Sequence, residues 1–326
     1  MRNAREWGRT GLAALLLMLW GGPLAHAEQI VLKLGAEENT THKYYPAAVQ
    51  FAKDVEAFTK GAVTVDLYFA GQLGGAEELC EGLQMGTIDL TVQASKIGKL
   101  ERAYEVFDLP FLVPNVAAGR KILDGPIGQE MAQGFAKKGA RLLAYWELGF
   151  RHITNNRQPV VTPADLKGMK IRVPDNKLRM ATFETFGASV SVTSLGELYL
   201  ALKQGVLDGT EQPLGTIWSN RFYEVQKYLS ISNHVFTPGY LLVREESWRK
   251  LSKELQAEVL KAAEMSRDLV RKLSDDEDNN FVAKLRDAGM KVNEIDSKSF
   301  QAAVKAIWEK EGKRFGDLPK RIVAAQ

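Results

Sequence analysis

The alternation of short apolar strands with amphipathic helices is the feature that most constrains the fold of this chain. Residues 29–36 and 62–69 alternate apolar and polar side chains as half-buried strands do, and residues 39–61 between them have helical periodicity. Thr40 or Thr41 is expected to cap this helix. Strands that alternate with helices of this length predict an α/β fold with mainly parallel sheets.

A motif of the form E-L-x-x-x-L-x-x-G-x-x-D occurs twice, at residues 78–89 and 197–208. In each copy a glycine stands where a helix ends in a left-handed residue, and a strand follows directly. Four residues beyond each final aspartate lies a glutamine, Gln93 or Gln212. Two similar lobes that present matching strand ends to a shared cleft would explain the repeat. The alternative is that any two helix-to-strand turns resemble one another.

A long helical segment follows in the C-terminal part of the chain. Residues 251–289 keep an apolar period near that of an α-helix. A continuous helix of about 35 residues would be roughly 52 Å long, more than the diameter of a small domain, so it should contact both lobes. The polar run at residues 274–280 could break it. Beyond it, residues 290–295 predict a strand, and Ser297 or Ser299 is expected to cap a last helix.

The N-terminus has the pattern of a secretory signal peptide. Three arginines precede an apolar run, and residues 21–27 end in an A-x-A pattern. We expect residues 1–27 to direct export, with cleavage after Ala27; a retained anchor is the alternative. Cys80 is the only cysteine and lies in a helical pattern, which excludes an internal disulfide and a cysteine-based zinc site.

The composition is that of a globular protein with about two domains. Of the 326 residues, 45% are hydrophobic and 25% are charged. The 43 basic and 40 acidic side chains are spread along the chain, and no basic block indicates a nucleic-acid partner. Neither H-E-x-x-H nor G-x-S-x-G occurs, and the four histidines are scattered. The sequence therefore predicts no metal site and no cofactor.

Two arginines stand at the expected ends of strands, where ligands of open α/β sheets bind. Arg172 lies in residues 169–173, and Arg151 follows an expected strand at residues 140–150. A guanidinium among buried neighbours must reach solvent, pair with an internal acid or bind an external anion. Its planar fork fits a carboxylate, and no glycine-rich phosphate loop is present. A carboxylate ligand is therefore preferred, with a structural ion pair as the alternative.

The run D-G-T-E-Q-P adds further candidates. Asp208 precedes a glycine and suits a turn, although with Glu211 it could also act as acid or base in an enzyme. The amide of Gln212 can donate hydrogen bonds to a ligand and accept them from it. Trp218 lies just beyond and could wall a pocket, but its spacing is also typical of helix packing.

Several segments, in one order, resemble the substrate-binding proteins of TRAP (tripartite ATP-independent periplasmic) transporters. They are "GQLGGAEELCEGLQMGTIDLTV", "FDLPFLV", "GFRHITNNR", "DLKGMKIRVPDN", "FGASV", "ELYLALKQGVLDGTEQP" and "FYEVQKYLSISNHVF". The resemblance covers nearly the whole chain after the leader. It implies a two-lobed periplasmic-binding-protein fold, with one long helix between the lobes, that closes around an organic acid and delivers it to an ion-gradient-driven membrane permease.

The resemblance also implies roles for single residues. The family arginine that binds the ligand carboxylate matches Arg172, and a second family arginine matches Arg151. Gln212 stands where the family commonly has asparagine, and Asp175 stands where some sialic-acid-binding members have asparagine. Both departures bear on the ligand class. Asp175 argues against a second ligand carboxylate and favours hydroxyl or amine groups. Gln93 is a further candidate because of its matching place in the repeat.

These observations predict a periplasmic binding protein, not an enzyme, whose partners are a small organic acid and the subunits of a TRAP permease. Two alternatives stay open. One is a periplasmic enzyme that uses Asp175, Asp208 or Glu211 as acid or base, and the other is a protein that presents its ligand to a sensor. The expected lobes are residues 28–149 with 238–275, and residues 150–237 with 276–326.

Overall fold

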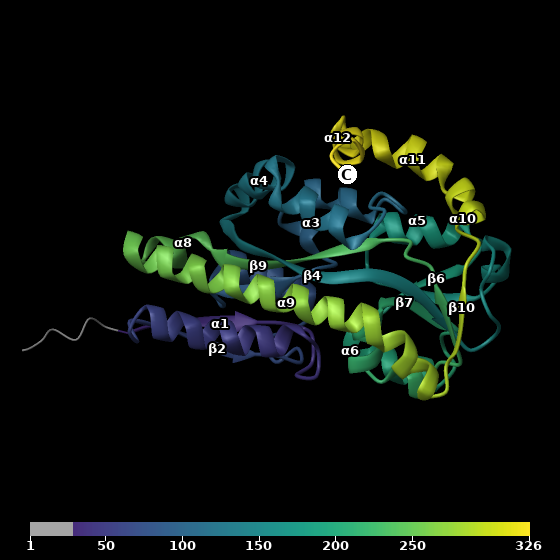
Figure 1. Ribbon diagram of the computed structural model, residues 1–326, viewed down its shortest axis with the longest axis horizontal. Coiled ribbons are helices and arrows are strands. Elements are labelled where there is room, and N and C mark those ends of the chain that lie inside the picture. The colour runs from purple at the N-terminus through teal and green to yellow at the C-terminus, as the bar shows by residue number, and fades with distance from the viewer. Residues whose placement is uncertain (1–28) are drawn as a thin grey trace, which may run out of the picture.

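The structure is a computed structural model that describes residues 29–326 (Figure 1). The expected signal peptide, residues 1–27, and its cleavage site lie outside the described residues. The strands are β1 (Ile30–Gly35), β2 (Val63–Tyr68), β3 (Leu90–Gln93), β4 (Ala140–Asn155), β5 (Lys170–Val173), β6 (Ser189–Val192), β7 (Gly209–Pro213), β8 (Tyr228–Ile231), β9 (Phe236–Arg244) and β10 (Lys291–Glu294). The helices are α1 (Tyr44–Phe58), α2 (Ala76–Met85), α3 (Val116–Asp124), α4 (Pro126–Ala132), α5 (Lys177–Thr185), α6 (Leu195–Lys203), α7 (Leu214–Ser219), α8 (Glu245–Arg249), α9 (Lys253–Asp287), α10 (Ser297–Ala303), α11 (Lys305–Glu311) and α12 (Leu318–Ala324). Within this described part, no helix has both the length and the apolar character that crossing a bilayer requires.

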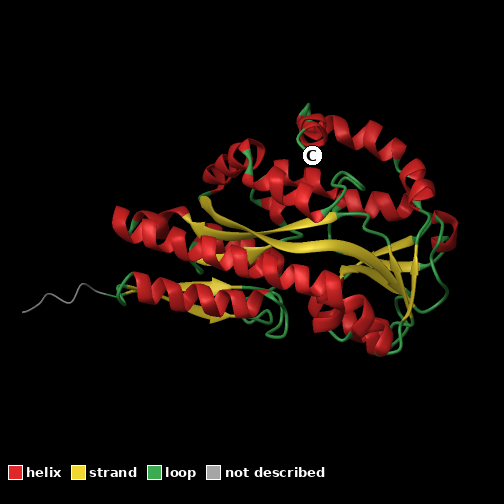
Figure 2. Ribbon diagram, in the orientation of Figure 1, coloured by secondary structure: helices red, strands yellow, loops and turns green. Residues whose placement is uncertain are grey.

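The strands form two sheet regions that share β4. The main path runs β2-β1-β3-β9-β4-β7-β5-β6, and β8 and β10 attach to β4 beside it. The first part of β4 pairs with β9, and its last residues pair with β7 and β8. We call the half with β1, β2 and β3 lobe I, and the half with β5 to β8 lobe II. Figure 2 shows the strands of both lobes enclosed by helices.

The predicted α/β fold is confirmed, but each sheet region is mixed. In lobe I, β1 pairs in parallel with β2 and β3, and in lobe II, β5 pairs in parallel with β6 and β7. Antiparallel pairs arise wherever β4 or β9 takes part. These two strands run in opposite directions as they connect the lobes, so they must pair antiparallel.

The strand β4 is longer than the sequence predicts. Its 16 residues extend to Asn155, five residues past the expected end at residue 150. A register shift between Glu147 and Gly149, with a φ of 106° at Gly149, lets the strand bend without ending. Arg151 therefore lies inside β4 and not at a strand end, which corrects the expectation from the sequence.

The repeated motif has the same structure in both lobes. Gly86 and Gly205, with φ of 86° and 70°, follow the ends of α2 and α6 in the left-handed conformation. Asp89 accepts a hydrogen bond of 3.0 Å from the backbone N–H of Lys33, and Asp208 accepts one of 2.7 Å from that of Lys170. Each aspartate thus ties its turn to the neighbouring parallel strand, β1 or β5.

The helix α9 is continuous over its 35 residues, and the polar run at residues 274–280 does not break it. It contacts α1 and β4 on one side and α7 and β10 on the other, so it packs against both lobes as expected (Figure 1). The polar run has a structural use, because Ser274 and Glu277 both accept hydrogen bonds of 2.8 Å from the buried ammonium of Lys43.

Two expected helix caps differ in the structure. The helix α1 begins only at Tyr44, and neither Thr40 nor Thr41 caps it. Instead, the Asn39 side chain accepts a hydrogen bond from the Thr41 N–H in the loop that leads from β1. At α10, Asp296 caps the helix in place of Ser297 or Ser299. In both places the chain leaves the preceding strand through a polar turn that competes with the predicted cap.

The C-terminal helices contact both lobes. The indole N–H of Trp308 donates to the carbonyl of Pro110 at 2.9 Å, and the Gln326 amide donates to the carbonyl of Leu112 at 2.6 Å. Ile307 of α11 and Ile322 of α12 belong to a hydrophobic core that also contains side chains of α3, α4 and α5. The same helices also contact lobe II, since α11 packs against α5 and Phe300 of α10 packs against Phe186. The expected assignment of residues 276–326 to lobe II stays a prediction.

Candidate ligand-binding site

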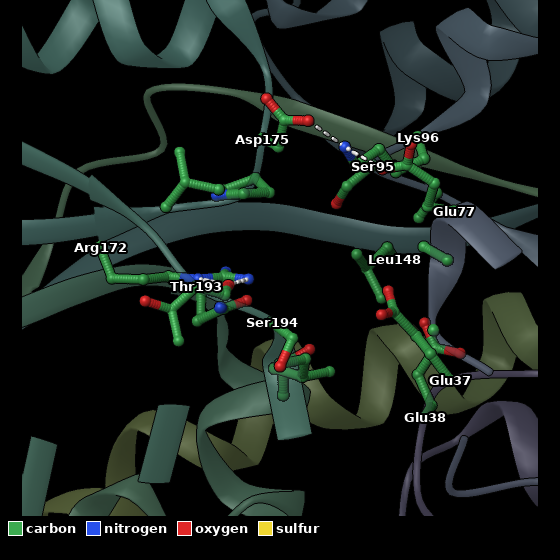
Figure 3. A pocket seen from close by; sticks show the side chains of 18 of the residues that line it. Glu37, Glu38, Glu77, Ser95, Lys96, Leu148, Arg172, Asp175, Thr193 and Ser194 are labelled. Carbon is green, nitrogen blue, oxygen red and sulfur yellow. Dashed lines mark hydrogen bonds and ion pairs between the residues drawn. The ribbon is translucent and has the colours of Figure 1, made fainter. Parts of the chain in front are cut away.

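A cavity of about 270 Å³ lies between the lobes, at the carboxyl ends of several strands (Figure 3). Both α2 and α6 begin at its wall. Its position is the one that open α/β sheets offer to ligands. The lining side chains that matter below are Glu37, Glu38, Lys96, Arg151, Arg172, Asp175, Thr193 and Gln212.

Arg172, at the end of β5, lines this cavity with only 5% of its surface exposed. Its Nε and Nη2 atoms donate to the Thr193 carbonyl at 2.8 and 2.5 Å. These two hydrogen bonds fix one edge of the guanidinium and leave the Nη1 side available to a ligand. Burial lowers the pKa of Arg172 to about 10, against the opposing effect of Glu211, so the group stays charged at neutral pH.

The buried charges around Arg172 leave it without a carboxylate partner. Arg151 forms an ion pair with Glu211, and Arg179 donates from Nε to Asp108 at 2.7 Å. Among residues 29–326, no aspartate or glutamate forms an ion pair with Arg172. Arg151 and Arg179 are thus each paired with a buried acid, and Arg172 lines the cavity without an ion pair of its own in this range.

Arg151 also lines the cavity, but most of its donors are already used. It is 1% exposed, and its Nη2 donates to the Glu211 carbonyl at 2.7 Å, to Glu211 Oε1 at 3.0 Å and to Gln212 Oε1 at 3.1 Å. Burial lowers the pKa of this guanidinium, and Glu211 opposes the shift. Arg151 is therefore first a structural partner of Glu211.

Gln212, within β7, offers an unused donor to the cavity. Its side chain is 3% exposed, and its Nε2 has no hydrogen-bond partner among the described residues. Its Oε1 already accepts from Arg151. The amide is thus fixed at Oε1, and its Nε2 is available to donate a hydrogen bond to a ligand, as the polar groups of binding pockets do.

Two predicted site residues do not line the cavity. Gln93 is buried in β3, and its amide donates to Thr91 Oγ1 at 3.1 Å. Trp218, in α7, stacks on Tyr223 with ring centroids 4.9 Å apart and packs against Phe281 at 5.7 Å. Trp218 therefore belongs to the packing of lobe II, the alternative that its helical spacing already indicated.

Asp175 stands at the rim of the cavity and reaches across it. It forms an ion pair with Lys96 of lobe I, drawn as a dashed line in Figure 3. Lys96 also lies 3.2 Å from Glu77 on its own lobe. The negative charge of Asp175 is thus paired with a lysine of the opposite lobe.

Glu37 and Glu38, which follow β1, are cavity residues that the sequence analysis missed. Glu38 is 5% exposed, and its Oε2 has no hydrogen-bond partner among the described residues. Burial, together with the neighbouring Glu37, raises the pKa of Glu38 to about 8. Burial also raises the pKa of Glu37, while Arg172 opposes that shift. The sequence feature that could have indicated them is a pair of acids directly after the first expected strand, residues 29–36.

The acids proposed for a rival enzyme are occupied or distant. Asp208 is not in the cavity lining and binds the Lys170 N–H, while Glu211 is fully buried against Arg151. Ser232, His234 and Glu211 are linked in series by contacts of 2.7 and 3.3 Å, but each is at most 2% exposed and none lines the cavity. No cluster of metal-binding side chains occurs within residues 29–326.

Comparison with known proteins agrees with this geometry. Residues 34–314 match the model of "Bacterial extracellular solute-binding protein, family 7". The 2,3-diketo-L-gulonate-binding periplasmic protein of Escherichia coli is 33% identical over 301 residues, which cover 90% of this chain and 92% of the relative.

Two solved structures are also similar. A TRAP periplasmic solute-binding protein from Bordetella, with density interpreted as pantoate, has a TM-score of 0.88 and 36% identity, covering 91% of this chain and all (100%) of the other. One from Polaromonas sp. JS666, bound to D-erythronate, has a TM-score of 0.88 and 33% identity, covering 91% and 99%. The protein therefore belongs to family 7 of the bacterial extracellular solute-binding proteins, the family of the TRAP periplasmic solute-binding proteins.

Proposed function

We propose that this protein binds a small organic acid between its lobes through Arg172 and delivers it to a TRAP-type membrane permease for ion-gradient-driven uptake. The observation that carries the proposal is the buried guanidinium of Arg172, which lines the cavity and pairs with no carboxylate of residues 29–326. A buried charge without a counter-ion is costly, and a ligand carboxylate supplies that counter-ion. The fork of Arg172 then makes two charge-assisted hydrogen bonds.

The charges of the cavity favour a ligand with one carboxylate. Of the three cationic side chains in the lining, Lys96 pairs with Asp175 and Arg151 pairs with Glu211, so only Arg172 is left. The opposite wall carries glutamates. A second ligand carboxylate would find no unpaired cation there among the described residues and would lie beside acids whose pKa values burial already raises, so its own charge would be costly.

The size of the cavity and the ligands of similar proteins support a small hydroxylated acid. At about 270 Å³ the cavity is just below the roughly 300–1,000 Å³ of drug-sized pockets. D-Erythronate, bound to the Polaromonas protein, and pantoate, assigned in the Bordetella protein, each combine one carboxylate with hydroxyl groups. 2,3-Diketo-L-gulonate, named for the Escherichia coli relative, does so as well.

Family membership and the N-terminal sequence support the proposed location and delivery. The signal peptide expected in residues 1–27 and the periplasmic relatives support a periplasmic protein. A binding protein there captures the acid, and closure of the lobes around it presents a defined surface to the permease. We assign no catalytic role to any residue.

The test begins with the ligand that the protein retains. Native mass spectrometry of the purified protein, followed by denaturation, identifies a co-purified acid, and calorimetry with that acid compares variants. Arg172→Met should lower affinity at least about 100-fold, because two hydrogen bonds of roughly 1.5–3 kcal/mol each are lost. The affinity of Arg172→Lys should lie between those of the wild type and Arg172→Met, because lysine keeps the positive charge but lacks the planar fork of the guanidinium.

Arg286→Met is the matched control, since Arg286 is exposed on α9 and lies outside the cavity. Its affinity should equal that of the wild type. A folded Arg172→Met protein with wild-type affinity would remove Arg172 from the site. Conversion of the bound acid into a product would contradict a binding role.

A further inference from the structure

The wall of the cavity opposite Arg172 is formed by Glu37 and Glu38 of lobe I (Figure 3). Both residues lie just beyond β1, separated from it by Ala36, so the carboxyl end of that strand places them at the cleft. Neither forms an ion pair within residues 29–326. The cavity thus has a cationic side at Arg172 and a carboxyl side that forms no ion pair within residues 29–326.

Glu38 is the more informative of the two. It is 5% exposed, and its Oε2 is buried without a hydrogen-bond partner in the described residues. Buried polar atoms are almost always hydrogen-bonded, so an unpartnered carboxyl oxygen at a ligand cavity indicates a group that the ligand satisfies. The Nε2 atom of Gln212, unpartnered at the same cavity, is its counterpart on lobe II.

The surroundings of Glu38 favour a neutral hydrogen-bonding partner. Glu37 lies beside it on the same loop, Tyr44 of α1 is the ionisable neighbour behind it, and Lys96, Arg151 and Arg172 are the cations of the lining. Burial first, and Glu37 second, raise the pKa of Glu38 to about 8, so at neutral pH its carboxyl can both donate and accept. A ligand hydroxyl group matches both functions and adds no charge.

We propose that Glu38 is a ligand-binding residue that sets selectivity: its carboxyl binds a hydroxyl group at the end of the ligand opposite the carboxylate held by Arg172. The proposal rests on the function proposed above and names the second anchor of the same site. It explains why a hydroxylated monocarboxylate fits, since an apolar end leaves Glu38 unpartnered and an end carboxylate adds an anion beside Glu37.

The test uses acids that differ only at the far carbon. D-Erythronate, 2,3-dihydroxybutanoate and meso-tartrate end in CH2OH, CH3 and a carboxylate, and L-galactonate, L-fuconate and galactarate form the corresponding six-carbon series. By calorimetry, the wild type should prefer the CH2OH member over the other two by about tenfold or more, the effect of one buried hydrogen bond. Glu38→Leu should lose most of the preference for the CH2OH member over the CH3 member. Glu38→Gln, which keeps a hydrogen-bond donor and an acceptor, should retain this preference.

The matched control is Glu264→Leu, because Glu264 is exposed on α9 outside the cavity. It should leave all the preferences unchanged. Thermal melting checks that each variant is folded, and if Glu38→Leu fails to fold, Glu38→Gln and the pH profile below decide. A folded Glu38→Leu protein with wild-type preferences would overturn the proposal.

The pH profile gives a second, independent readout. As pH rises through about 8, Glu38 loses its proton and adds a negative charge that faces the bound anion, so wild-type affinity should fall. The range from about pH 6.5 to about pH 9 keeps Arg172 charged, given its pKa of about 10. Glu38→Gln should show no such fall. Equal profiles for the two proteins would contradict the proposal.

The two proposals fail in different ways. If the acid found by mass spectrometry depends on Arg172 but lacks a hydroxyl group at its far end, the binding function stands and the role of Glu38 fails. If its affinity does not depend on Arg172, the binding function itself fails.

Discussion

Gln212 and Gln93 occupy the same place in the two copies of the repeated motif, yet only Gln212 lines the cavity. Gln93 lies opposite Tyr240 of β9, and its amide donates within its own strand to Thr91. Gln212 is fixed at Oε1 by Arg151 and keeps its Nε2 for the cavity. Equivalent positions in a repeat thus take different roles when their neighbours differ.

This difference supplies a matched pair of substitutions. Gln212→Met keeps the length of the side chain but removes its amide, so affinity for the natural acid should fall about 10- to 150-fold, the effect of one hydrogen bond to a charged group. Gln93→Met should leave affinity unchanged. Calorimetry checks both variants, and equal effects on affinity would show that Gln212 does not contact the ligand.

Sequence reasoning found some residues of the site and missed others, for physical reasons. Arg172 was predicted as a site residue because strand alternation and the following proline place it at the carboxyl end of a strand. The pairing of Arg151 was not predicted, because Glu211 is 60 residues away along the chain. Glu38 was missed because it lies between the expected strand and the expected helix, where local periodicity predicts no burial.

At the scale of elements, the aspartates that end the two motifs act as anchors between parallel strands. Asp89 binds the N–H of Lys33 and the hydroxyl of Ser247, and Asp208 binds the N–H of Lys170. These bonds hold the start of each following strand in place beneath the cleft. They also give Asp208 a structural role, which its place before a glycine had suggested.

We expect Asp89→Ala and Asp208→Ala each to lower the free energy of unfolding by about 1.5–3 kcal/mol, the range for hydrogen bonds to a charged group. Neither should change ligand affinity, because neither aspartate lines the cavity. Urea denaturation measures the first effect and calorimetry the second. Loss of binding in a stable Asp208→Ala protein would place Asp208 in the site and favour the rival enzyme.

The elements themselves could be predicted better than their arrangement. Periodicity gave the strands around α1 and the full length of α9, because both depend on local burial patterns. Periodicity did not predict the length of β4. Without knowledge of its pairing with β9 and β7, the bend at Gly149 resembles the end of the strand. Nor could periodicity show which surfaces α11 and α12 pack against, because these surfaces are far away in sequence.

At the scale of the whole molecule, the lobes touch on both sides of the cavity. On one side Lys96 pairs with Asp175, and on the other the Asn39 amide donates to the Ser219 carbonyl at 2.9 Å. The helix α9 and the strands β4 and β9 connect the lobes behind these contacts. Opening the cleft therefore requires both rim contacts to break while the three connecting elements bend.

The ion pair at the rim should slow release of the ligand. Asp175 is more than half exposed, so the pair contributes only about 0.2–1 kcal/mol, and Lys96→Met should raise the dissociation rate roughly 1.5-fold to fivefold. Stopped-flow measurement of release checks this, and added salt should produce part of the same effect in the wild type.

Asp175→Asn and the double variant complete a mutant cycle with Lys96→Met. The double variant should release ligand no faster than the faster single variant, because both substitutions break one contact. Fully additive effects would mean that the two residues act on the ligand separately.

The burial of Cys80 in α2 makes this molecule convenient for optical work. Burial raises the pKa of the only thiol to about 12, so almost no reactive thiolate exists at neutral pH. Met85 and Leu200, exposed on α2 and at the matching helix of the other half, can then be replaced by cysteine and coupled to a dye pair. Energy transfer between the dyes would time each capture event directly, with no background from the native side chain.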